Sequence, residues 1–122
     1  MIRAYAHADL WIEEGILHFV YKPNTIIDLE TAKEIVKDRL RFQRGVPYPI
    51  LCDIRHLTLA DKPARDFLAE KGCINALAIA FVIEEAYSGT LIQAFINISN
   101  PSVPTSEFTT IPEALAFLSD YI

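Results

Sequence analysis

The chain has 122 residues, of which 52% are hydrophobic and 22% are charged, and its formal net charge at pH 7 is −5. This length matches one domain, and the composition supports a packed core. The acidic balance argues against nucleic-acid binding, which needs clustered Lys and Arg, and it disfavours anionic membranes. We therefore expect one domain over residues 1–122, with no nucleic-acid partner and no stable membrane insertion.

The expected location is the cytoplasm. The first residues lack the apolar stretch of a secretory signal, and the apolar run 74–83 is too short to span a bilayer. Both cysteines, Cys52 and Cys73, lie beside apolar runs. We interpret them as buried thiols in a reducing compartment, and a disulfide between them is the weaker alternative.

The first half of the chain predicts a hairpin, a helix and a buried strand. Residues 8–23 alternate apolar and polar side chains around a turn at Glu13-Glu14-Gly15. Residues 28–45 have helical spacing, with Asp28 as N-cap and Gly45 as the stop. Residues 48–54 are a short apolar run that ends in Cys-Asp-Ile, typical of a buried strand.

The second half alternates helices and strands. Asp61 is a good N-cap for a helix, and Thr110 and Glu113 form a capping box before the last helix. The apolar run 74–83 predicts a strand covered on both faces. In chain order, the expected elements are a helix at 61–72, a strand at 74–83, a helix at 84–99, a weak edge strand at 104–110 and a helix at 110–122.

The predicted order is therefore β-β-α-β-α-β-α-β-α. Strands that alternate with helices after a hairpin are typical of an α/β fold with a mostly parallel sheet and right-handed crossovers. The first strand of the hairpin should run antiparallel to the others. Trp11 lies on that strand, and we expect it near a sheet edge, where it would serve as an anchor in a symmetric homodimer.

The motifs of common enzymes are missing from the sequence. Its four glycines form neither of the phosphate-binding patterns GxGxxG and GxxxxGK[ST], so we expect no nucleotide cofactor. Cys52, Asp53 and His56 lie close in sequence and could form a metal site or a Cys–His pair. We favour a buried cysteine, an aspartate that binds loop N–H groups and a solvated histidine, because alternate strand residues face opposite ways. We therefore predict no catalytic residue and no metal.

Two stretches carry a resemblance, "LWIEEGILHFVYKPNTIIDLETAKEIVKDRL" and "YPILCDIRHLTLADKPARDFLA". With the element order, they resemble STAS domains, the SpoIIAA-like relatives of bacterial anti-sigma-factor antagonists, and more narrowly the small bacterial STAS/SEC14-like proteins. In the antagonists, an Asp-Ser-[Ser/Thr]-Gly run opens the second helix, and a partner kinase phosphorylates one hydroxyl. Here the run is Asp61-Lys62-Pro63-Ala64, so we expect no phosphorylation switch, and the nearest hydroxyl is Thr58.

The resemblance implies a non-catalytic regulatory module that binds a protein partner. The candidate surface comprises polar and charged residues of the strand–loop–helix junction, namely Asp53, Arg55, His56, Thr58, Asp61, Lys62 and Arg65. One alternative is a carrier of small apolar, lipid-like ligands of the SEC14 type, which needs an apolar cavity of several hundred Å³. The other is an enzyme that uses Cys52, Asp53 or His56.

Overall fold

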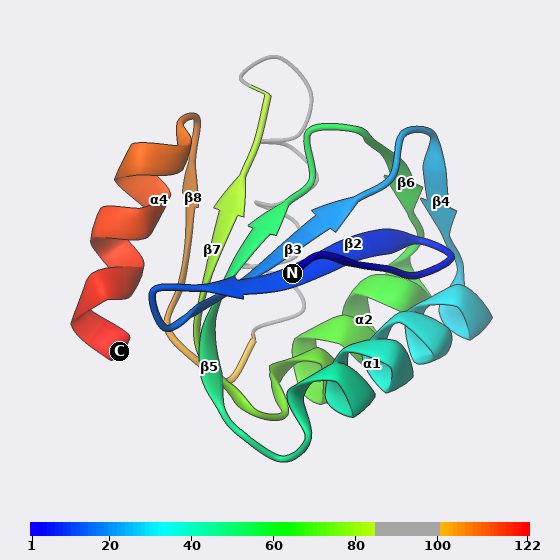
Figure 1. The fold of residues 1–122 in the computed structure, drawn as a ribbon. Coiled ribbons are helices and arrows are strands. Elements are labelled where there is room, and N and C mark those ends of the chain that lie inside the picture. Colours follow the sequence, from blue (N-terminus) through cyan, green and yellow to red (C-terminus); the bar gives the residue numbers. More distant parts are fainter. Residues whose placement is uncertain (85–100) are drawn as a thin grey trace.

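In the computed structural model, which describes residues 1–84 and 101–122, the chain opens with three antiparallel strands (Figure 1). These are β1 (Arg3–Ala4), β2 (Ala8–Glu13) and β3 (Ile16–Tyr21). Glu14 and Gly15 form the turn between β2 and β3, with φ values of 52° and 82°. Positive φ at both positions matches the twist of a tight hairpin. The predicted hairpin is confirmed.

Parallel strands continue the sheet beyond β3. They are β5 (Tyr48–Asp53), β7 (Ala76–Val82) and β8 (Thr105–Phe108), in the order β1-β2-β3-β5-β7-β8. β3, β5, β7 and β8 are mutually parallel, and β2 is antiparallel to β3. The predictions of a mostly parallel sheet, an antiparallel first hairpin strand and an edge position for the last strand are therefore confirmed.

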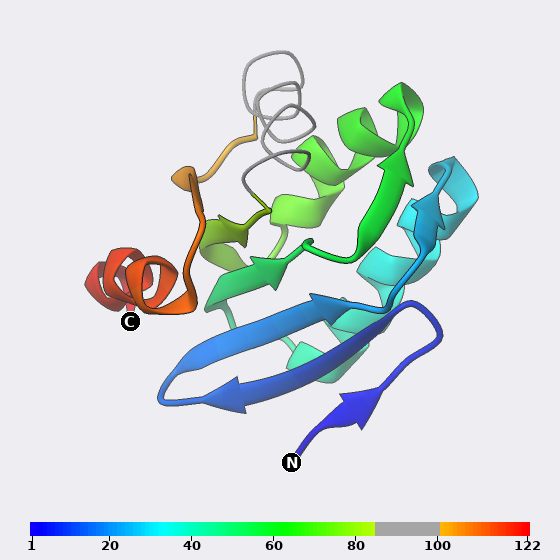
Figure 2. The same ribbon diagram turned by 90° about the horizontal axis from the view of Figure 1, so that it is seen from above.

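Helices cover both faces of this sheet (Figure 2). α1 (Leu29–Gln43) and α2 (Lys62–Glu70) pack on one face, and a 3₁₀ turn, Lys71–Cys73, follows α2. α4 (Ile111–Leu118) and the 3₁₀ turn Ser119–Tyr121 lie on the other face. The three predicted N-caps, Asp28, Asp61 and Thr110, each accept a backbone N–H in the first turn. None of the described helices is long and apolar enough to cross a membrane.

The two faces of the sheet are packed differently. The face under α1 and α2 is lined by large side chains such as Leu10, Phe19 and Phe81. The opposite face carries Ala78 and Ala80 on β7, which allow α4 to approach the sheet closely. α4 contacts β5, β7 and β8. The β2–β3 half of this second face has no comparable contact with a described helix.

Two short strands were not predicted from the sequence. β4 (Thr25–Ile27) and β6 (Leu57–Ala60) pair in parallel as a separate two-stranded ribbon next to the starts of α1 and α2 (Figure 1). The observed element order therefore contains β1, β4 and β6 in addition to the predicted strands. The prediction treated these segments as loops. The helix predicted at 84–99 lies almost wholly outside the described residues.

Trp11 lies near a sheet edge, as predicted, although not on the edge strand itself: the two-residue β1 pairs with Asp9 and Leu10 on the outer side of β2. Its indole stacks on the His18 ring of β3, with ring centroids 4.9 Å apart and an interplanar angle of 11°. The indole Nε1 donates a hydrogen bond to Glu13 at 3.3 Å. Trp11 is half-buried and His18 is buried. The stack therefore lies on the half of the sheet face that has fewer contacts with α4.

Candidate functional site

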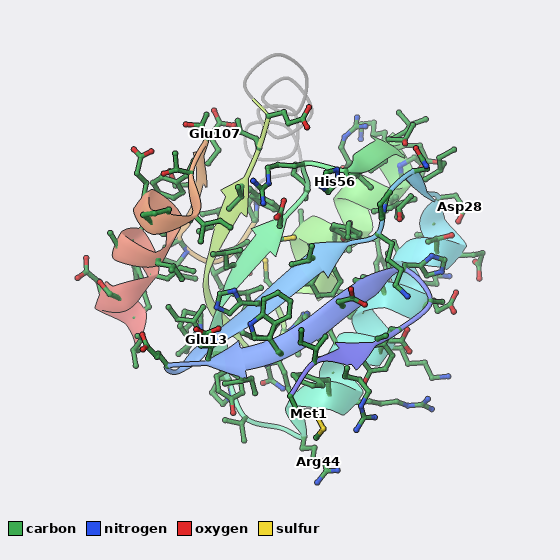
Figure 3. All side chains as sticks on the ribbon, turned by 45° about the horizontal axis from the view of Figure 1, so that its top comes forward. Met1, Glu13, Asp28, Arg44, His56 and Glu107 are labelled. Carbon is green, nitrogen blue, oxygen red and sulfur yellow. The ribbon has the colours of Figure 1, made fainter. Side chains whose placement is uncertain are left out.

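Three elements meet where β5 ends: the loop 54–56, the β4–β6 ribbon and the first turn of α2. Figure 3 shows His56 on this loop, at the opposite end of the molecule from Arg44, the C-cap of α1. In a parallel sheet the carboxyl ends of the strands form the usual position for a ligand or partner. The seven candidate residues follow one another through this junction, but the structure gives them different roles.

Asp53 and Arg55 form a closed ion pair. The Asp53 carboxylate is 4% exposed, and it accepts Arg55 Nε at 3.0 Å, Nη2 at 2.6 Å and the Arg55 backbone N–H at 3.1 Å. These hydrogen bonds raise the pKa of Arg55 above its usual value. The predicted role of Asp53, binding loop N–H groups, is confirmed. Its carboxylate is engaged inside the fold, so Arg55 is the member of the pair that reaches the surface.

Asp61 and Lys62 shape the beginning of α2. Asp61 Oδ1 accepts the Ala64 N–H at 3.0 Å, and the Asp61 N–H donates to Ile27 O of β4 at 3.2 Å. Asp61 therefore caps the helix and also joins it to the ribbon. Lys62 is exposed, and its Nζ donates to Asp66 at 2.7 Å. An exposed pair of this kind adds little stability, which leaves Lys62 available for contacts.

The ribbon presents two exposed apolar side chains that the sequence analysis missed. Ile26 of β4 and Leu59 of β6 are partners in the ladder and are 60% and 52% exposed. Thr58, also exposed, lies at the register shift between the two strands and has no partner residue in the ladder. The sequence signal was the short alternation in Thr25–Ile27 and Leu57–Ala60. This alternation was not sufficient to predict the ribbon, because three or four residues are too few to distinguish a strand from a loop.

Cys52, Asp53 and His56 do not form a cluster. Cys52 is buried on the face under α1 and α2, whereas its neighbour Asp53 points to the other face and His56 is exposed on the loop. Burial raises the pKa of the Cys52 thiol strongly, and the Asp53 charge adds to this effect. Cys52 and Cys73 are both free and buried. Among residues 1–84 and 101–122, no group of three or more His, Cys, Asp and Glu side chains has a metal-binding arrangement.

Arg65, the last candidate, lines a cavity that is only partly enclosed. The cavity has a volume of about 80 Å³ and lies between α1, α2 and the sheet. Its wall is mostly apolar, with Phe19, Ile50 and Ile79 from the sheet, and it includes a second arginine, Arg39 of α1. Arg65 Nη1 donates to Ala60 O at 2.7 Å. Arg65 therefore belongs at least in part to the interior rather than to the outer surface.

Arg39 and Gln43 are buried polar residues on the apolar side of α1. Arg39 is 4% exposed, and its guanidinium donates to Gln43 Oε1, to Ile74 O at 3.0 Å and to Gly72 O at 2.8 Å. Gln43 Nε2 donates to Val46 O and to Asn75 O, both at 2.9 Å. Burial lowers the pKa of Arg39. Together the two side chains hold the turn that leads into β7, and we call them the α1 clamp.

The architecture defines this chain as a protein with a SpoIIAA-like fold. A solved structure of an uncharacterized protein from Shewanella loihica PV-4, of the DUF3478 family and with a SpoIIAA-like fold, superposes with a TM-score of 0.57. The two sequences are 15% identical, and the match covers 95% of this chain and 98% of the other. At that identity the likeness establishes the fold alone.

The particular family follows from the sequence. Residues 10–122 match the model of the Domain of unknown function (DUF7793), so the chain belongs to this family. A comparison with curated proteins finds no match. The expected SpoIIAA-like fold is therefore supported, whereas the narrower likeness to STAS/SEC14-like proteins stays a prediction.

Proposed function

We propose that this protein is a non-catalytic regulatory module of the STAS type, which binds a protein partner in the cytoplasm. The supporting observation is the exposed pair Ile26–Leu59, which lies beside the first turn of α2. Apolar side chains surrounded by charged and polar groups are typical of protein interfaces. Here Thr58 lies on β6 beside Leu59, and the charged residues Arg55 and Lys62 lie just before and just after this strand.

The first turn of α2 bears on how such binding would be regulated. In the anti-sigma-factor antagonists that this chain resembles, the hydroxyls that accept phosphate lie at the positions of Lys62 and Pro63. Ala64, the next residue, is fully buried. We therefore expect binding that does not depend on phosphorylation of residues 58–66. Incubation with a co-encoded kinase and ATP, followed by mass spectrometry, tests this. A stoichiometric phosphate on Thr58 would contradict it.

Site-specific crosslinking tests the docking surface. A photoreactive residue at position 59 should give one dominant crosslinked protein in cells, and the same residue at Val46 should not. Val46 is a suitable control because its side chain is also exposed and apolar but lies in the loop after α1. The captured protein is then purified and titrated: Leu59→Ser should weaken binding by more than tenfold and Val46→Ser by less than twofold. Equal effects of the two variants would refute the assignment.

We also propose a symmetric homodimer. Trp11 and Val20 are half-buried on the β2–β3 half of the sheet face, where α4 makes fewer contacts than with β5, β7 and β8, and pairing two such faces would cover them. Sedimentation equilibrium should give twice the chain mass of 13.8 kDa at micromolar concentration. Trp11→Ala should weaken the dimer by more than about 1 kcal/mol, as expected for a buried aromatic anchor. A constant mass of one chain would rule the dimer out.

The SEC14-type alternative has less support. The cavity of about 80 Å³ is well below the roughly 300–1,000 Å³ of sites for larger ligands. A lipid tail therefore does not fit this cavity without expansion of the core. A larger hollow of about 560 Å³ lies on the outside of α1 and α2, but it is a shallow surface groove that would leave a lipid tail exposed to water.

A further inference from the structure

The cavity between α1, α2 and the sheet contains positive charge without a matching carboxylate. Neither Arg39 nor Arg65 takes part in any salt bridge among the described residues. The ionisable groups that interact with Arg39 are Cys52, Tyr21 and Cys73, and burial raises the pKa of Cys52 and Tyr21. Since a guanidinium stays charged in proteins, Arg39 is a buried cation that no described acid neutralises. Burying a charge without a counter-ion is costly.

Arg65 also has an unused hydrogen-bond donor, whereas Arg39 donates to Gln43 Oε1, Ile74 O and Gly72 O. Arg65 Nε is buried and has no hydrogen-bond partner. Buried donors without partners are rare, and each one needs an explanation such as a missing acceptor. An anionic acceptor in the cavity would satisfy Arg65 Nε and bring a negative charge close to its guanidinium.

The remaining wall restricts the kind of anion. Apart from the two arginines, the lining is dominated by apolar side chains from the sheet and both helices. An inorganic ion would leave this surface without contacts, whereas an alkyl group would fill it. An engineered apolar cavity of about 150 Å³ binds benzene, so a volume of about 80 Å³ suits a ligand of roughly three to five non-hydrogen atoms.

We infer that this cavity binds a short-chain monocarboxylate such as acetate or propionate. Its carboxylate accepts a hydrogen bond from Arg65 Nε, and its alkyl end packs against the apolar wall. Arginine suits this role because its planar fork matches a carboxylate and gives short, charge-assisted hydrogen bonds. The site is separate from the exposed Ile26–Leu59 pair, so this inference does not depend on the proposed partner binding.

Titration calorimetry and thermal unfolding of the full chain test the inference with propionate as the probe. 1-Propanol and propylammonium are size-matched neutral and cationic controls, and sodium chloride controls for ionic strength. We expect propionate to bind saturably with a Kd in the millimolar range or below, since a ligand of five non-hydrogen atoms has a limited affinity. The controls should neither saturate nor raise Tm comparably. Equal stabilisation by 1-propanol would overturn the inference, because it would mean that apolar filling alone is responsible. Equal stabilisation by chloride would also overturn it, because it would mean an adventitious ion only.

Variants locate the binding in the cavity. Arg65→Gln should weaken propionate at least tenfold, and Ala60→Val should do the same by filling space, since Ala60 is buried in the cavity wall. Lys62→Gln is the matched control, because it also removes one positive charge from α2 but lies outside the lining. Circular dichroism establishes that each variant is folded. Unchanged affinity in Arg65→Gln, or equal losses in Lys62→Gln, would refute the site.

Discussion

Replacing Arg39 with methionine would test how strongly the α1 clamp stabilises the fold. The side chain of methionine fills much of the same space but cannot donate hydrogen bonds. The change removes the bonds to Gly72 O, Ile74 O and Gln43 Oε1, and it leaves these acceptors without the partner that now reaches them from α1. It also removes a charge that the native protein must bury.

The magnitude depends on two opposing effects. Hydrogen bonds from a charged donor contribute about 1.5–3 kcal/mol each, so three of them contribute roughly 5–9 kcal/mol. Burial of one ion costs several kcal/mol in the native protein, and the variant no longer has this cost. We expect the hydrogen-bond loss to dominate, with a net fall of about 2–4 kcal/mol in the free energy of unfolding. A domain of this size has roughly 6–18 kcal/mol in total, so the variant should remain folded.

Urea unfolding monitored by circular dichroism measures the change. Arg41→Met is the control, because Arg41 is exposed on the same helix, and its effect should stay within about 0.5 kcal/mol. A double-mutant cycle with Gln43→Met should give a coupling of about 1–2 kcal/mol between the two clamp residues. A loss below about 0.5 kcal/mol in Arg39→Met, or no coupling, would refute the view that the clamp supports the turn before β7.

Three further predictions follow from single residues. Asp61→Ala should lower stability by about 0.5–2 kcal/mol in urea unfolding because it removes the cap of α2, whereas Asp61→Asn should be nearly neutral because an asparagine oxygen also caps a helix; a silent alanine variant would contradict the cap. Burial lowers the pKa of His18 in the folded protein, and the charge of Glu13 opposes this shift only in part. In the unfolded chain His18 has its ordinary pKa of 6.5, so as the pH falls the unfolded chain binds this proton before the folded protein does. Stability should therefore fall as the pH drops from 7.5 to 5.5; His18→Phe should flatten that slope and His56→Gln should not. Cys52 in the folded protein should react with a thiol reagent near neutral pH only as fast as the protein opens, because burial disfavours the thiolate; rapid labelling would reopen the enzyme hypothesis.

Much of the fold was predictable because it depends on local signals. The caps Asp28, Asp61 and Thr110 mark helix starts by side-chain chemistry alone, and the structure confirms all three. The run 74–83 predicted a strand buried on both faces, and β7 lies between β5 and β8. The ribbon was missed because β4 and β6 are too short to show a period, and because their pairing joins segments about 30 residues apart in the sequence.

The interior of the site was less predictable than its surface. Arg39 and Gln43 recur at helical spacing after Ala32 and Ile35, on the stripe that faces the core. The sequence analysis did not single them out, although this spacing was the signal for burial. The contacts that explain them involve backbone carbonyls more than 30 residues away, which only the tertiary structure reveals. In the same way, no local pattern indicates that Arg65 lines a cavity rather than facing solvent.

The α1 clamp has a consequence for the order of folding. Arg39 and Gln43 bind the carbonyls of residues 72–75 immediately before β7, which pairs with β5 near the middle of the sheet. The turn cannot obtain these bonds until α1 has docked, so the register of β7 should be set late, after the loop of more than 30 residues has closed. Clamp variants should therefore accelerate unfolding and leave the refolding rate nearly unchanged. In stopped-flow measurements on Arg39→Met, the unfolding rate should rise and the refolding rate should stay nearly the same. Slower refolding would instead place the clamp in the folding nucleus.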